Sequence, residues 1–262
     1  DILVNRYLQN MTLNECGDQL DITRERVRQI EKKALTQLNE DLLLSRYIDK
    51  LTLFGHKLDE DELKIILKND LLLSVFKANE LNSVFYSGIS KMFYFKNLEE
   101  IREVTKKIED YKKELCIYGD FEDLKEDILN IYPKANSVEV DNIILFYRLK
   151  VIKGYYYKEN ISIAFMFEFY LKYLNKKSIL ISEDTYEDLV EDIESYFGPL
   201  SFTKSVRNIS AILDRLDGII LVDSRTYQHI DHCGLDEEKI DRLEEIVDEG
   251  LEVYDTLTSD RL

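Results

Sequence analysis

The chain has 262 residues, of which 45% are hydrophobic, so it is long enough for two or more domains with apolar cores. Its two prolines and nine glycines are few for this length, which favours helices joined by a few hairpins. The net charge of −17 excludes a protein that binds nucleic acid over its whole surface, because a polyanion is repelled by a large acidic surface. We therefore predict a mainly α protein in which any contact with a polyanion is local.

The cysteines and the hydropathy of the chain indicate the cellular compartment of the protein. Cys16, Cys116 and Cys233 are odd in number and far apart, so they do not form a disulfide framework. We find neither a signal peptide nor an apolar run of about 18 residues, and we expect a cytoplasmic protein that does not enter a membrane. Because the chain starts at Asp1 without a methionine, we also expect a segment upstream of it.

The first predicted elements are three short helices. Apolar side chains among residues 2–7 indicate an amphipathic helix, and Thr12-Leu13-Asn14-Glu15 is a capping box that starts a second helix ending near Leu20. Thr23 is another good N-cap. The apolar residues that follow it fall on one helical stripe, at Val27, Ile30, Ala34, Leu35 and Leu38. Three helices in this order predict a helix-turn-helix over residues 1–40.

The opposite face of the third helix carries side chains suited to reading DNA. Arginine donates two hydrogen bonds to guanine, glutamate accepts one from cytosine, and glutamine pairs with adenine in the major groove. Residues 1–38 hold six basic and six acidic residues, so the whole net charge lies in the rest of the chain. The only dense basic cluster, Arg24 to Lys33, therefore lies in a neutral segment, and we expect DNA contact at this end of the chain.

These helices resemble a known family. The segments Thr12–Gly17 (TLNECG) and Thr23–Glu31 (TRERVRQIE), followed by Ala34-Leu35, are similar to region 4 of bacterial primary-type sigma factors, which recognises the promoter −35 element. The resemblance covers about residues 1–38, and the first helix of that region is missing or lies upstream of Asp1. No segment resembles the sigma regions that melt the −10 element and bind the polymerase clamp.

The resemblance implies a role for each residue on the exposed face. Arg24, Glu25 and Gln29 would contact −35 bases, and Arg28 would contact a base or the backbone. We place Arg28 with the base readers. The phosphate contacts would come from Thr23, Arg26 and Lys32, to which we add the neighbouring Lys33. Cys16 stands where the family usually has an aliphatic core residue, so we expect it to pack in the core.

The rest of the chain contains internal repeats. Residues 121–128 recur as residues 186–193, and each copy continues into a helical segment and two short strands. A weaker third copy lies upstream. Three helices followed by a hairpin are typical of a winged helix. We place the boundaries of the predicted units where this order of elements starts again. The predicted parts after residue 40 are three winged-helix-like units at 41–97, 98–158 and 159–234 and a C-terminal helix at 235–262.

The helix before each hairpin is the candidate recognition helix of its unit. It carries Asp70 and Lys77 in the first unit and Glu139 and Asp141 in the second, with too little positive charge for groove binding. The third unit leaves a secondary DNA contact open, at Lys204, Arg207 and Arg225. Otherwise we expect the acidic units to form a scaffold that contacts RNA polymerase, a partner protein or a second copy of the chain.

Signs of catalysis are missing from the sequence. His229, His232 and Cys233 are closely spaced, but a zinc site needs a fourth ligand and no Cys-x-x-Cys or second histidine pair is present. No phosphate loop, nucleophile elbow or zinc-protease helix occurs. We predict no metal, no cofactor and no enzymatic activity.

The sequence leads to two hypotheses about function, which belong to different classes of protein. The first is a sequence-specific double-stranded DNA-binding protein of transcription that reads a −35-type promoter element, with RNA polymerase or as a regulator working apart from it. The alternative is a protein-interaction adaptor or polymerase-binding inhibitor that uses its acidic body, and a homo-oligomer is compatible with both.

Overall fold

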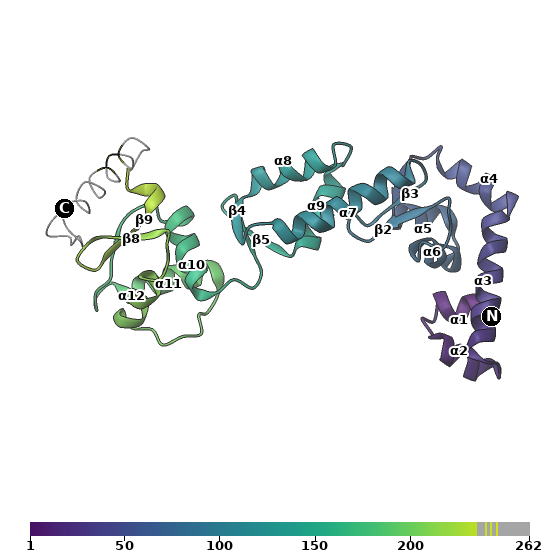
Figure 1. Ribbon diagram of the computed structural model, residues 1–262, viewed down its shortest axis with the longest axis horizontal. Coiled ribbons are helices and arrows are strands. Elements are labelled where there is room, and N and C mark those ends of the chain that lie inside the picture. The colour runs from purple at the N-terminus through teal and green to yellow at the C-terminus, as the bar shows by residue number, and fades with distance from the viewer. Residues whose placement is uncertain (235–238, 240–241, 243–244, 246–262) are drawn as a thin grey trace. The chain divides into compact units, whose positions relative to one another are not determined.

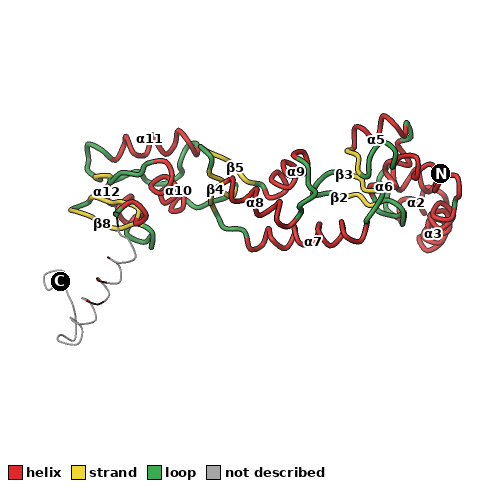
Figure 2. Tube along the Cα trace, turned by 90° about the horizontal axis from the view of Figure 1, so that it is seen from above, coloured by secondary structure: helices red, strands yellow, loops and turns green. Residues whose placement is uncertain are grey.

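The computed structural model describes residues 1–234, 239, 242 and 245. By their contacts the residues form two compact units, the first comprising 1–116 and 120–149 and the second 117–119 and the chain from Lys150 onward. Helices dominate both units and the strands are short (Figure 1; Figure 2). This confirms the predicted mainly α class with short hairpins. The predicted C-terminal helix at 235–262 lies almost wholly outside the described residues.

Three helices open the first unit: α1 (Ile2–Tyr7), α2 (Leu13–Leu20) and α3 (Arg24–Glu40). Thr12 and Glu15 form the predicted capping box at the start of α2. The hydroxyl of Thr23 accepts a hydrogen bond from the backbone N–H of Arg26 at 3.2 Å and so caps α3 as predicted. The helix-turn-helix expected from the sequence is therefore present.

After α3, one order of elements occurs three times: a helix, a strand, two helices and a hairpin. The first copy contains α4 (Leu42–Leu51), β1 (Lys57–Asp59), α5 (Glu60–Leu67), α6 (Asp70–Lys77), β2 (Phe85–Ser87) and β3 (Met92–Tyr94). The second contains α7 (Leu98–Glu114), β4 (Tyr118–Asp120), α8 (Phe121–Ile131), α9 (Ser137–Tyr147), β5 (Leu149–Ile152) and β6 (Tyr155–Lys158). The third contains α10 (Ile163–Phe169), the π-helical turn η1 (Tyr170–Leu174), β7 (Ile179–Leu180), α11 (Tyr186–Phe197), α12 (Val206–Leu213), β8 (Ile219–Asp223), β9 (Thr226–His229) and the 3-10 turn η2 (Ile230–His232).

Each copy has its own three-stranded sheet, with strand orders β1-β3-β2, β4-β6-β5 and β7-β9-β8. The last strand of each hairpin lies in the middle, so Phe93 of β3 pairs with Leu58 on one side and with Tyr86 on the other. The sequence predicted the three hairpins but not the first strand of each sheet. The division between the two units passes through the second copy, whose helices belong to the first unit and whose strands belong mostly to the second.

The helix-turn-helix and the first copy share one apolar core. Leu3 and Tyr7 of α1 pack against a cluster that includes Val75 and Phe76 of α6, both nearly inaccessible to solvent. Because α1 contacts α6, the candidate recognition helix of the first copy is covered on this side. A groove-binding role for α6 therefore receives no support from its position.

A buried polar network joins the first copy to the second. The Glu139 side chain is fully buried and accepts hydrogen bonds from the hydroxyls of Tyr94 at 2.6 Å and Tyr132 at 3.1 Å, and also from the ammonium group of Lys57. The backbone N–H of Asn136 donates to it as well, at 2.7 Å. The sequence marks Glu139 only as a negative charge on a candidate recognition helix and does not predict its burial. Its charge is enclosed, and the ion pair and hydrogen bonds compensate for the cost of burying it.

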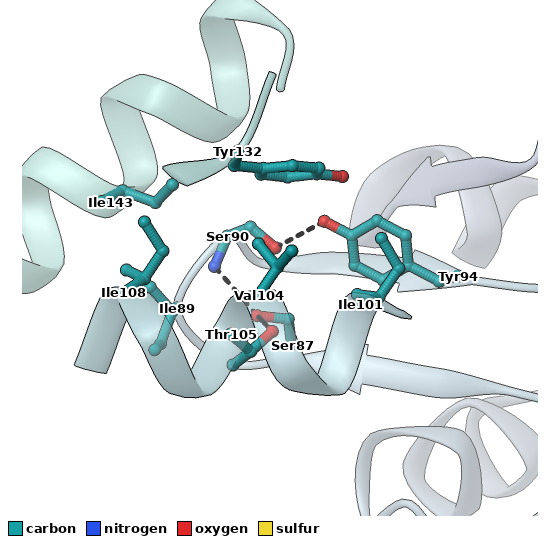
Figure 3. A pocket seen from close by; sticks show the side chains of 10 residues that line it. All are labelled: Ser87, Ile89, Ser90, Tyr94, Ile101, Val104, Thr105, Ile108, Tyr132 and Ile143. Carbon is teal, nitrogen blue, oxygen red and sulfur yellow. Dashed lines mark hydrogen bonds between the residues drawn. The ribbon is translucent and has the colours of Figure 1, made fainter. Parts of the chain in front are cut away.

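A small cavity lies beside this network (Figure 3). Figure 3 shows Tyr132 and Ile143 of the second copy facing the β2–β3 hairpin, where the hydroxyls of Ser90 and Tyr94 are hydrogen-bonded at 2.9 Å. The side-chain N–H of Asn142 in α9 also donates to the carbonyl of Ser90 at 2.8 Å. The candidate recognition helix of the second copy is thus docked on the first copy.

We expect Glu139→Ala to destabilise the first unit by about 3–5 kcal/mol, because it leaves a lysine and two tyrosine hydroxyls without their buried acceptor. Urea denaturation followed by circular dichroism measures this change. Glu126→Ala removes an exposed carboxylate from α8 and should change stability by no more than about 0.5 kcal/mol. Equal effects of the two substitutions would contradict a structural role for the Glu139 network.

Candidate nucleic-acid interface

The helix α3 has one buried and one exposed face. Val27 and Leu35 are buried, with exposed fractions of 0% and 9%. The structure leaves every residue predicted for DNA contact in this helix-turn-helix exposed to solvent: Thr23, Arg24, Glu25, Arg26, Arg28, Gln29, Lys32 and Lys33. Arg24, Glu25, Arg28, Gln29 and Lys32 recur at steps of one, three or four and so share one side of α3, while Thr23, Arg26 and Lys33 flank them; we call the whole set the α3 face.

A tight turn holds α2 against α3. Asp21 ends α2 in the left-handed region at φ 55°, and the backbone N–H of Ile22 donates to the carbonyl of Gly17 at 3.0 Å. A Cβ atom added to Gly17 would lie 2.7 Å from the carbonyl oxygen of Ile22. Glycine at this position therefore allows the close approach that sets the angle between the two helices.

Polar contacts brace the other side of the three-helix arrangement. The guanidinium of Arg6 in α1 donates to Glu31 of α3 at 2.9 Å, and the amide of Asn5 donates to Gln19 of α2 at 2.9 Å. Cys16 is fully buried, as its predicted packing role requires, and burial raises the pKa of its thiol. These contacts use the inner faces of the helices and leave the α3 face free.

Three of the predicted base readers are hydrogen-bonded to one another. Arg28 donates two hydrogen bonds to the carboxylate of Glu25, at 2.8 and 2.7 Å, and Gln29 donates a third at 3.2 Å. The hydrogen bonds from Arg28 lower the pKa of Glu25 to about 2, although the pair is exposed. Arg28 and Glu25 are therefore oriented before any partner binds, and either must rearrange in part to reach a base edge.

The other four cations of the α3 face form no ion pair among the described residues. Within the part of the chain that the structure describes, Arg24, Arg26, Lys32 and Lys33 have no carboxylate within ion-pair distance. Four unpaired cations on one helix create a positive potential in an otherwise acidic protein. The arrangement suits a partner that carries regularly spaced negative charges.

A groove lies along α3 and shares Arg28 and Lys32 with the α3 face. Its lining combines residues of three segments: Arg28, Glu31, Lys32, Leu35, Thr36 and Asn39 of α3, Arg6 of α1, and Glu80 from the segment after α6. Sequence reasoning missed Glu80 because it is 41 residues from Asn39 along the chain, and only the shared core of α1 and α6 brings the two together. No local pattern marks it.

The residues considered for a secondary DNA contact lie on three segments of the third copy. Lys204 is paired with Glu194 at 2.7 Å, which reduces its availability to a phosphate. Arg207 is exposed on α12, and Arg225 is exposed in the β8–β9 turn at φ 54°. A DNA contact by these residues stays a prediction.

The closely spaced histidines are engaged in local contacts. The ring of His229 is buried and its Nδ1 accepts from the backbone N–H of Asp231 at 3.2 Å, while His232 Nε2 lies 2.6 Å from the carbonyl oxygen of Lys172. Cys233 Sγ is 3.4 Å from the carbonyl oxygen of His229. Among the described residues, no three His, Cys, Asp or Glu side chains are grouped as metal ligands.

The comparisons with known proteins address the same segment. The family model for Sigma-70, region 4 matches residues 1–40. No curated protein and no solved structure matches the chain. The match confirms the resemblance found in the sequence and identifies residues 1–40 as a DNA-binding helix-turn-helix with a role related to transcription; the matched family is not an enzymatic one. In the described part of the chain, none of the helices has the length and hydropathy of a bilayer span.

We expect Gly17→Ala to destabilise the helix-turn-helix by about 1–3 kcal/mol, because the added methyl group collides with a backbone oxygen that belongs to the turn. Thermal unfolding measures the loss. Gly88→Ala is the matched control, since a Cβ atom at Gly88 meets no atom within 4 Å. If both variants unfold at the same temperature, the turn does not depend on the close approach at Gly17.

We also expect the Glu25 carboxylate to titrate near pH 2 and not near its usual value of 4.5. Its lowered pKa means that the Arg28 pair is intact above pH 4.5 and is lost only as the pH falls through about 2. Carbon NMR of the side-chain carboxyl follows the titration. In Arg28→Ala the midpoint should move back toward 4.5, and an unchanged midpoint would show that Arg28 does not cause the shift.

Proposed function

We propose that residues 1–40 read a −35-type element of bacterial promoter DNA through the α3 face. Arg24, Glu25, Arg28 and Gln29 are the base readers. Their side chains match the donor and acceptor groups of guanine, cytosine and adenine in the major groove. The observation that carries the proposal is the exposure of this whole set on one helix of a segment that matches Sigma-70, region 4.

The phosphate contacts come from the flanks of the same face. Thr23, Arg26, Lys32 and Lys33 are exposed there and contribute affinity that does not depend on sequence. With a net charge of −17 on the whole chain, this small basic surface must face the duplex while the acidic copies are held away from it. Binding of this kind belongs to the cytoplasm of a bacterial cell.

We further propose that the three copies are winged-helix-like domains that serve as a scaffold. Their strand orders, with the first strand beside the last, suit this fold. In the first two copies the helix before the hairpin is packed against a neighbour, which favours a supporting role over groove binding. RNA polymerase and a second copy of the chain are the partners that this scaffold would position.

A second candidate is an adaptor or polymerase-binding inhibitor that acts through its acidic body. The concentration of the entire net charge outside the first 38 residues favours it. The variant Arg24→Ala with Arg28→Ala in the full chain separates the two candidates. Polymerase binding that survives in this variant, together with no measurable DNA binding by the unchanged chain, would favour the adaptor.

The test of the DNA-reading function is a random-site selection with the purified full chain, carried out at several salt concentrations. We expect enrichment of a −35-like consensus. Arg24→Ala should relax the preference at one guanine, at a cost of about 1–3 kcal/mol for the matched site. Lys32→Ala is the control that should weaken all sequences alike and reduce the salt slope by about 1. Equal weakening of all sites by Arg24→Ala would mean that Arg24 only holds phosphate.

A further inference from the structure

We propose that Glu80 repels phosphate at the C-terminal end of the α3 groove and so weakens the binding of DNA that makes only phosphate contacts. The inference rests on the proposed function, because it concerns how the same helix treats matched and unmatched duplexes. It assigns a specificity role to a residue of the first copy, outside the segment that matches Sigma-70, region 4.

The position of Glu80 is fixed by its backbone. The side chain of Asn39 at the end of α3 donates to the carbonyl oxygen of Glu80 at 3.0 Å, and the backbone N–H of Asn82 donates back to Asn39 at 2.8 Å. This double contact anchors the segment after α6 to α3. The carboxylate of Glu80 consequently cannot move far from the groove that it lines with Arg28 and Lys32.

The negative charge of Glu80 also reaches α1, the helix that supplies Arg6 to this groove. Burial, followed by the charges of Glu80 and Glu31, raises the pKa of Tyr7 in α1. Glu31 is neutralised by Arg6 at 2.9 Å, whereas Glu80 is exposed and has no cation within ion-pair distance among the described residues. Glu80 is therefore the uncompensated acid at this end of the groove.

A phosphate that approached Thr36 or Asn39 would meet this charge. At 1.5 Å per residue, Asn39 lies roughly 10 Å along the helix from Lys32, which is about the Debye length at 0.1 M salt. In a matched complex, base contacts fix the duplex at the first half of α3. An unmatched complex has only phosphate contacts and is free to shift along the helix. The carboxylate of Glu80 makes that shift less favourable, because it repels the phosphates that would come close to it.

The experiment compares Glu80→Gln with Glu126→Gln in the full chain. Both substitutions remove one exposed negative charge, and Glu126 lies on α8, away from the groove. Fluorescence anisotropy measures the affinity of each protein for a duplex carrying a −35 element and for a scrambled duplex of the same length, at low and at physiological salt. We expect Glu80→Gln to bind the scrambled duplex about threefold more tightly than the unchanged chain, with a smaller gain on the −35 duplex. Glu126→Gln should match the unchanged chain on both.

Each other result has a defined meaning. If the unchanged chain prefers the −35 duplex, equal gains of Glu80→Gln on both duplexes would overturn the role of Glu80, and identical behaviour of Glu80→Gln and Glu126→Gln would overturn it in every case. If the unchanged chain binds both duplexes equally well, the promoter-reading function is contradicted, yet a tighter Glu80→Gln complex would still support phosphate repulsion. An absence of binding to either duplex at low salt would overturn both proposals.

Discussion

The orientation of the α3 face depends on the close approach of α2 and α3 at Gly17. The carbonyl oxygen of Ile22 occupies the space where any other residue would place its Cβ atom. This contact, with the N-cap at Thr23, directs α3 so that one face packs inward through Val27 and the other points to solvent. If the turn were wider, the exposed side chains would no longer form one surface against a support.

The helix-turn-helix is supported by the rest of the first unit. Tyr7 of α1 packs with α6 in a common core, and Asn39 ties the end of α3 to the segment after α6. The second copy is fastened in turn through buried Glu139. A short helix-turn-helix gains from this arrangement, because small domains bury too little surface to be very stable alone. The first copy thus holds the α3 face in place.

The sequence predicted well what is encoded locally. Capping residues at Thr12 and Thr23 and the apolar stripe through Val27 gave the helices of the N-terminal segment, and short apolar runs gave the three hairpins. The sequence did not predict burial or strand pairing that depends on parts of the chain far away in sequence. The burial of Glu139 was not predicted because its partners Lys57 and Tyr94 are far away in sequence, and the strand at 57–59 was missed because it is too short to have a recognisable period.

The most direct test of the central claim is hydrogen exchange of the full chain with and without a duplex carrying a −35 element. We expect slower exchange over the turn and the first half of α3, between Gly17 and Lys33, and little change on α12 or the β8–β9 hairpin. Protection confined to the third copy, or no protection at α3 at a saturating concentration of the duplex, would contradict it.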